Sequence, residues 1–228
     1  AAVVHAADAV VAGNDFLSAE AVRYTSPERI HDVPTCVDCR RYPLAEHRLQ
    51  GSGVQLVWIG SSSTLNGLDR CREILERVGE QNPGVRLKLI CDRFLRFEHL
   101  PVVETKWEES AEAGELASAD IGISWLPDDA WSQGKCGLKV LQYLAAGLPV
   151  VANRVGVQCQ MVQHGVNGYL ADTPAQWAEC VRRLANDAEL RRRLGRNGRR
   201  LVQERYSLPV AVERWLRVIE AMPRRSVA

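Results

Sequence analysis

The chain has 228 residues, enough for one well-packed domain with an additional piece attached. Hydrophobic residues make up 46% and charged residues 25% of it, as in ordinary globular proteins, and the net charge of +1 provides no bulk field to attract nucleic acid. No stretch approaches the roughly 20 consecutive apolar residues of a membrane-spanning helix, so we expect a cytoplasmic protein without a nucleic-acid partner.

The N-terminal zone, residues 1–50, is too short to bury a core of its own. Its first residue is Ala, helix-like sequence begins at once, and the basic start of a signal peptide is absent, so we expect a chain cut from a longer one. The pattern predicts a strand at 9–12, a helix at 16–24 and a second strand at 30–33. We interpret this zone as the remnant of a preceding domain and a crossover from it.

The cysteine pattern gives no support for a metal site. Seven cysteines are scattered through the chain, mostly within apolar runs, which is typical of reduced, buried thiols. Cys36 and Cys39 form a lone CxxC, and a structural zinc would need a second pair at matching spacing. We therefore expect incidental thiols, with metal binding or redox chemistry as the open alternative.

The central zone, residues 51–206, begins at a Gly51-Ser52-Gly53 linker, and strands and helices then alternate as far as residue 172. Near-continuous apolar strands that alternate with helices predict an α/β fold with a doubly wound, Rossmann-like parallel sheet. The predicted strands are 54–60, 85–90, 101–107, 119–126, 148–152 and 167–171.

The C-terminal zone is predicted to be helical. Thr173 and Pro174 form an N-cap followed by Pro at the first helical position. An arginine-rich helix over 191–205 is interpreted as a solvated face, with contact to anionic lipid headgroups as the open alternative. A last helix in 207–228 is expected to return towards the preceding domain.

Two loops at the carboxyl ends of the predicted strands are candidate ligand contacts, because ligands bind there in sheets of this kind. The first contains Gly60, Ser61 and Ser62, where small residues and a helix N-terminus would suit a phosphate. The alternative is that a hydroxyl near this point only caps the following helix.

The second loop opens a helix over about 137–146 and carries two lysines in an unfavourable place. Lys135, Lys139 and Gln142 lie at i, i+4 and i+7 and so share one helical face. Like charges at this spacing repel by a few tenths of a kcal/mol, and the positive helix end disfavours cations further. A bound diphosphate would reverse both penalties, with Gly137 and Leu138 exposing the first amides. A solvated pair of surface lysines is the alternative.

The segment AAGLPVVANRVGVQCQMVQHGVNGYLAD, residues 145–172, resembles the nucleotide-sugar-binding segment of family 4-like glycosyltransferases of the GT-B fold, the glycosyl transferases group 1. The similarity extends over about residues 54–206, and residues 7–38 resemble the crossover between the two domains of that family. The resemblance implies the donor-binding, C-terminal half of a GT-B fold. It further implies a retaining transfer of sugar from a nucleotide diphosphate sugar, without a metal, in polysaccharide or cell-envelope biosynthesis.

The chain departs from the family pattern at the site itself. The family's two glutamates fall on Gly134, which has no side chain, and on Gln142, which we expect to contact the ribose through its amide. The catalytic residues are thus left open. Trp107 and Trp131 are candidates for a base or rim contact, with plain packing as their alternative.

The partners follow from the same resemblance. We expect a nucleotide-sugar donor, and a carbohydrate or lipid-linked acceptor held by the other domain, with peripheral contact at the inner face of the membrane left open. We expect the fragment to be inactive alone. A non-catalytic glycosyltransferase-like partner subunit is the alternative function, because it would explain the loss of both glutamates.

Overall fold

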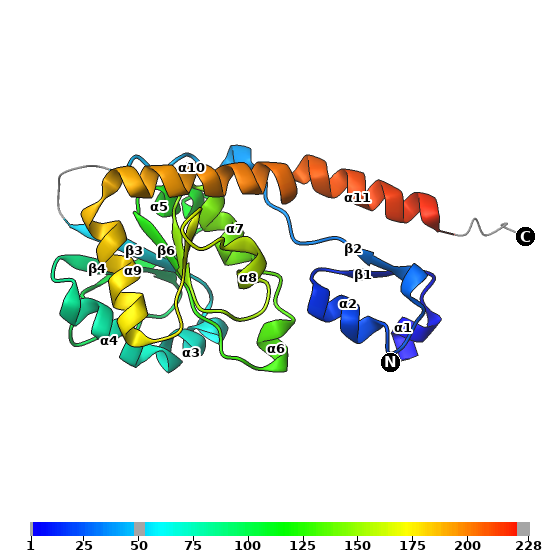
Figure 1. The fold of residues 1–228 in the computed structure, drawn as a ribbon, viewed down its shortest axis with the longest axis horizontal. Helices are drawn as coiled ribbons and strands as arrows, with labels where there is room; N and C mark the ends of the chain where they lie inside the picture. The colour runs from blue at the N-terminus through cyan, green and yellow to red at the C-terminus, as the bar shows by residue number, and fades with distance from the viewer. Residues whose placement is uncertain (1, 48–52, 223–228) are drawn as a thin grey trace, which may run out of the picture.

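A computed structural model describes residues 2–47 and 53–222 of the chain (Figure 1). A large α/β body contains the main sheet, and a small unit at the N-terminal end lies apart from it, reached by the long C-terminal helices. The predicted Gly51-Ser52-Gly53 linker falls mostly on residues outside the described ranges, and the predicted domain boundaries at 50/51 and 206/207 stay predictions.

The main sheet has six strands, all parallel, in the order β5-β4-β3-β6-β7-β8. Counted within this sheet, that is the 3-2-1-4-5-6 order of doubly wound nucleotide-binding folds, so the predicted fold class is confirmed. The strands are β3 (Val54–Ile59), β4 (Val85–Cys91), β5 (Val102–Lys106), β6 (Ile121–Ser124), β7 (Val150–Ala152) and β8 (Gly168–Leu170).

Helices cover both faces of this sheet, which explains why its central strands are apolar on both sides. In β3, Leu56 and Trp58 face one core cluster while Val57 and Ile59 face the other, as the two-residue repeat of a strand requires. The first face is covered by α3 (Ser62–Arg70), α4 (Arg72–Gln81) and α9 (Pro174–Asn186), and the second by α5 (Glu112–Ala117), α7 (Leu138–Ala145), α8 (Gln158–Met161) and α10 (Ala188–Arg205).

After β3, the apolar residues Leu68, Cys71, Leu75 and Val78 recur at helical spacing, which predicts one helix, but the segment forms two. Cys71 interrupts the run with φ −98° and ψ 22°, outside helical geometry, and its thiol donates to the carbonyl of Leu68 at 3.1 Å. The buried residues on both sides of the break nevertheless face the same core. Apolar spacing indicates which side chains point inward, but it does not show whether the backbone helix is continuous.

Residues before the linker form a β-α-β unit. Strands β1 (Val10–Ala12) and β2 (Ile30–Asp32) pair in parallel, with α2 (Asp15–Ala21) between them and α1 (Ala2–Ala6) in front. Short 3-10 turns follow at Pro27–Arg29 and Cys39–Arg41. Helix α11 (Leu208–Ala221) extends from the main body to this unit, where Arg214 lies 3.3 Å from Asp32 (Figure 1).

The C-terminal helices confirm one sequence prediction and correct another. Thr173 caps α9, with Gln176 completing a capping box. The arginine-rich face of α10 is only partly solvated. Arg191 is 3% exposed and donates to the carbonyls of Leu184 and Ala185, while Arg199 donates to the carbonyls of Tyr42 and Ala145. Charge runs predict solvation on average, but a guanidinium with enough acceptors can be buried.

Among residues 2–47 and 53–222, no helix combines the length and the apolar character that crossing a membrane requires. Helix α11 does expose an apolar stripe, in which Val212, Trp215, Leu216 and Ile219 are each about half accessible.

Candidate functional site

The candidate site lies where the order of the strands reverses. From β3 the chain moves outward to β4 and β5 and then returns to β6 on the other side of β3, so the loops after β3 and β6 separate at the carboxyl edge. Crevices at such switch points bind ligands in doubly wound sheets. The loop after β3 contains Gly60, and the loop after β6 continues through α6 (Ala130–Gln133) to the start of α7.

Tyr143 fixes α7 over this edge. Its buried hydroxyl accepts a hydrogen bond from the backbone N–H of Ile59 at 3.0 Å, and its ring packs where any side chain on Gly122 of β6 would collide with it. The first turn of α7 is thereby held beside the end of β3. As a result, Lys139, one turn before Tyr143, lies beside the Gly60 loop.

Lys139 is the central cation of the site. Its Nζ atom lies 4.1 Å from the centre of the Trp58 ring and donates to Oγ1 of Thr64 at 3.2 Å. An ammonium over an aromatic face is stabilised by the ring's quadrupole. The structure therefore joins two loops that are 75 residues apart in the sequence.

Gly60 is needed where it stands because there is no room for a side chain. A Cβ atom on this residue would lie 2.5 Å from Trp58, 2.7 Å from Thr64 and 2.8 Å from Nζ of Lys139. The backbone of Gly60 therefore lies directly beside the cation, and its N–H donates to the carbonyl of Ile90 at 3.1 Å.

Burial lowers the pKa of Lys139 to about 8, with repulsion from the charge of Lys135 as the second cause. The ammonium is thus short of compensating negative charge in the unliganded protein. An anion that arrived beside it would restore the stability of the charged form.

Helix α7 begins within one residue of its predicted start, but Lys135 lies before it and so does not share a helical face with Lys139 and Gln142 as predicted. Gly137 is its N-cap, in the left-handed region at φ +70°, and a Cβ there would lie 2.6 Å from Sδ of Met161. Leu138, the first helical residue, is half exposed. Lys135 lies just before this turn with its side chain half-buried.

The serine loop after β3 is partly occupied by an acidic residue that the sequence analysis missed. The backbone N–H of Ser62 donates to Oδ1 of Asp92 at 2.7 Å, and hydrogen bonds, first from Ser62 and then from Cys91, hold the pKa of Asp92 below its usual range. Ser61 and Ser63 share a hydrogen bond of 2.7 Å. A phosphate could use the amide of Ser62 only by displacing the Asp92 carboxylate.

Gln142 belongs to a second cluster, centred on Glu112, that the sequence analysis also missed. Gln142 is 7% exposed, and its Nε2 atom donates to Glu112 at 2.7 Å. The hydroxyl of Tyr42 donates to the same oxygen at 3.2 Å, and Nε1 of Trp107 to the other at 2.8 Å. Spacing along one helix could not reveal a partner that a different helix supplies.

The two tryptophans differ in their surroundings. Trp107 is 45% exposed, and its indole N–H donates to the Glu112 carboxylate that also accepts from Gln142. Trp131, on α6, is 81% exposed. The structure therefore brings Trp107 together with Gln142, and Lys139 with Gly60.

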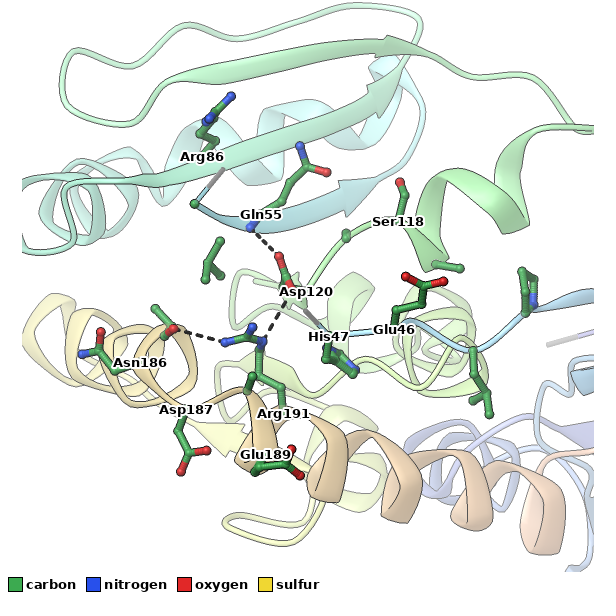
Figure 2. A pocket seen from close by; sticks show the side chains of 18 of the residues that line it. Glu46, His47, Gln55, Arg86, Ser118, Asp120, Asn186, Asp187, Glu189 and Arg191 are labelled. Carbon is green, nitrogen blue, oxygen red and sulfur yellow. Dashed lines mark hydrogen bonds and ion pairs between the residues drawn. The ribbon is translucent and has the colours of Figure 1, made fainter. Parts of the chain in front are cut away.

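A cavity of about 1030 Å³ opens at the opposite, amino edge of the sheet (Figure 2). Its charged groups are engaged with the protein: Asp120 accepts from the backbone N–H of Gln55 at 2.9 Å and lies 3.5 Å from Nε of Arg191. His47 is buried, with Nε2 2.8 Å from the carbonyl oxygen of Gly147, and burial lowers its pKa. These contacts join the start of β3 and the residue before β6 to α10, and His47 of the N-terminal zone to the turn after α7.

Comparison with known proteins identifies a matching family and relatives of this chain. Residues 130–201, which include the Lys135 loop and α7, match the model of the family described as glycosyl transferases group 1. The D-inositol 3-phosphate glycosyltransferase of Thermobifida fusca is 26% identical over 227 residues, covering 86% of this chain. The chain spans 51% of the length of that relative.

Solved structures give the same fold. HepE from Anabaena, solved in complex with UDP and glucose, superposes with a TM-score of 0.75 at 13% identity and covers 95% of this chain and 64% of its own. The C-terminal domain of LpcC from Francisella tularensis, a glycosyl transferase group 1 family protein, gives 0.60 at 18% identity over 75% of this chain and 99% of its own. The chain accordingly has the fold of the C-terminal half of a GT-B glycosyltransferase, and its residues 130–201 match the glycosyl transferases group 1 family.

Proposed function

We propose that this chain is the donor-binding part of a retaining glycosyltransferase, which transfers a sugar from a nucleotide diphosphate sugar to an acceptor. Lys139 and Lys135 hold the diphosphate together with Gly60 and the first amides of α7. Gln142 and Trp107 serve the nucleoside end. The observation that carries the proposal is the position of the Lys139 ammonium, beside the Gly60 backbone at the switch point of the sheet.

The chemistry of the site agrees with this assignment. A departing diphosphate gains negative charge in the transition state, and fixed cations and amides at a helix N-terminus stabilise such charge. The lowered pKa of Lys139 indicates that the site is electrostatically incomplete without an anion. HepE, which shares the fold, was solved with UDP and glucose bound.

The proposal is tested by measuring UDP binding by calorimetry at pH 7, with ADP and GDP alongside. Lys139→Ala should weaken binding by about 100-fold, since a charge-assisted contact to a phosphate contributes about 1.5–3 kcal/mol. Lys135→Ala should weaken it less, by about tenfold, because Lys135 lies before α7 while the ammonium of Lys139 is held beside Gly60. Lys106→Ala is the matched control, since Lys106 is exposed at the end of edge strand β5.

Unchanged affinity in both lysine variants, with the wild type binding UDP, would remove the diphosphate assignment. If the wild type bound none of the three nucleotides, the donor-binding role itself would be wrong.

The remaining expectations belong to the same proposal. They comprise transfer without a metal, a carbohydrate or lipid-linked acceptor bound by another domain, and a cytoplasmic location with peripheral membrane contact as the open alternative. The non-catalytic subunit predicted as an alternative is not favoured, because the family and the named relative are transferases.

A further inference from the structure

Asn14 connects the N-terminal β-α-β unit to the loop that carries Lys135. It lies in the turn between β1 and α2 and is 4% exposed. Its Oδ1 atom accepts from the backbone N–H of Leu17 at 2.9 Å and so caps α2. Its Nδ2 atom donates to the carbonyls of Gln133 at 3.2 Å and Lys135 at 3.0 Å. The oxygen of this buried amide is therefore bonded within the β-α-β unit, and its nitrogen is bonded to the loop of the main body.

Contacts on either side of Asn14 make the same connection. A Cβ atom on Gly13 would lie 2.5 Å from Sγ of Cys136, so the turn approaches the loop as closely as its backbone allows. On the other side, Nε2 of Gln160 donates to Oδ2 of Asp15 at 2.6 Å. Asn14 thus lies inside a continuous contact.

The hydrogen bond to the Lys135 carbonyl fixes the direction of that side chain. The peptide before Lys135 is held by its N–H, which donates to the carbonyl of Ser132 at 3.1 Å. The peptide after it is held by Asn14. Because peptides are planar, fixing the planes on both sides of a Cα atom fixes its φ and ψ and hence its Cα–Cβ direction. In a trans peptide the N–H points opposite to the C=O, so the N–H of Cys136 is turned away from α2.

We propose that Asn14 is a positioning residue for Lys135, through which the β-α-β unit sets the affinity of the main sheet for a diphosphate. This inference rests on the proposed function for the identity of the ligand. The hydrogen bonds between Asn14 and the loop do not depend on that function. When the unit is in place, the Cα–Cβ direction of Lys135 is fixed, and loss of the two Nδ2 bonds frees the loop while the rest of the site is unchanged.

The test replaces Asn14 by Ser and by Asp, both of which are good caps and keep an acceptor for Leu17. Asn14→Ser should weaken UDP binding by about tenfold, since both hydrogen bonds to the loop are lost. Asn14→Asp should weaken it further, because its carboxylate faces two carbonyl oxygens. Asp187→Ser is the control, since it changes the cap of α10 without touching this loop.

A double-mutant cycle separates positioning from a general loss of structure. In the Lys135→Ala background, Asn14→Ser should change UDP affinity by less than about twofold, because residues that act together are not additive. Full additivity of the two changes, or wild-type affinity in Asn14→Ser, would overturn the proposal.

Amide hydrogen exchange keeps the inference testable without a ligand. Asn14→Ser should accelerate exchange across residues 134–137 by about tenfold relative to Asp187→Ser, since the loop loses its anchor. If the wild type bound no nucleotide, the proposed function would fail while this measurement still decided the anchoring role. Unchanged exchange would then show that Asn14 does not hold the loop.

Discussion

The two edges of the main sheet use charge in opposite ways. At the amino edge, a cavity of about 1030 Å³ is lined by acidic residues and arginines, and Asp120 and Arg191 are bonded to neighbouring backbone and to each other (Figure 2). At the carboxyl edge, Lys139 has an aromatic ring and a hydroxyl as neighbours and a pKa lowered to about 8.

A cavity is therefore not by itself a binding site. Paired charges at the amino edge hold β3 and the residue before β6 against α10, and a ligand there would have to displace existing partners. The carboxyl edge has a cation whose desolvation is only partly compensated, next to the backbone of Gly60, where no side chain fits. We therefore expect changes at the first edge to affect stability and changes at the second to affect binding.

The largest expected effect is at the amino edge. Arg191→Met removes the donor from the carbonyls of Leu184 and Ala185 and should lower the free energy of unfolding by about 3 kcal/mol, since buried acceptors left unpaired are costly. UDP affinity should change by less than about twofold, because the cavity is remote from the donor site.

Arg193→Met, two residues along the same helix at an exposed position, is the control and should cost less than about 0.5 kcal/mol. Urea unfolding measures both variants. A large loss of UDP affinity in Arg191→Met at temperatures where it is folded would abolish the distinction between the edges.

The next effect concerns space at the carboxyl edge. Gly60→Ala places a methyl group against Trp58, Thr64 and Lys139 and should weaken UDP binding by more than about tenfold, because Lys139 must move from its position. Gly67→Ala is the matched control within α3, where a Cβ meets no atom within 4 Å.

That control should stabilise the protein by up to about 1 kcal/mol through helix propensity and leave binding unchanged. Calorimetric titration of both variants gives the comparison. Equal UDP affinity in Gly60→Ala and the wild type would show that the ligand does not approach this backbone.

The smallest effect is a pH dependence. A diphosphate favours the charged form of Lys139, whose pKa is about 8 in the free protein, so UDP affinity should fall by about twofold from pH 7 to pH 8 and more steeply above. Binding at pH 8 should take up about half a proton, measured by calorimetry in buffers of different ionisation enthalpy.

Stability responds to pH in the opposite direction. Between about pH 8 and the unfolded lysine pKa near 10.4, the unfolded chain binds more protons at this site, so the contribution of Lys139 to stability rises with pH. Lys139→Arg keeps a charge at all these pH values and should abolish the proton uptake. Proton uptake that persisted in this variant would assign it to another group.

The fold could be predicted from the sequence because its signals are local. Apolar runs such as Val54–Ile59 and the Thr173-Pro174 cap follow from residues adjacent in the chain, and alternation of strand and helix restricts the topology. The break at Cys71 was not predicted, because the inward-facing spacing continues across it.

The site was predictable only in part. The spacing of Lys135, Lys139 and Gln142 predicted one helical face, but Lys135 lies before α7. Glu112, Asp92 and Asn14 come from other elements and carry no pattern of their own. The sequence by itself determined the sheet, its helices and the lysines near the start of α7. Only the tertiary structure decided which groups face those cations, because contacts between loops up to 121 residues apart depend on how the layers pack.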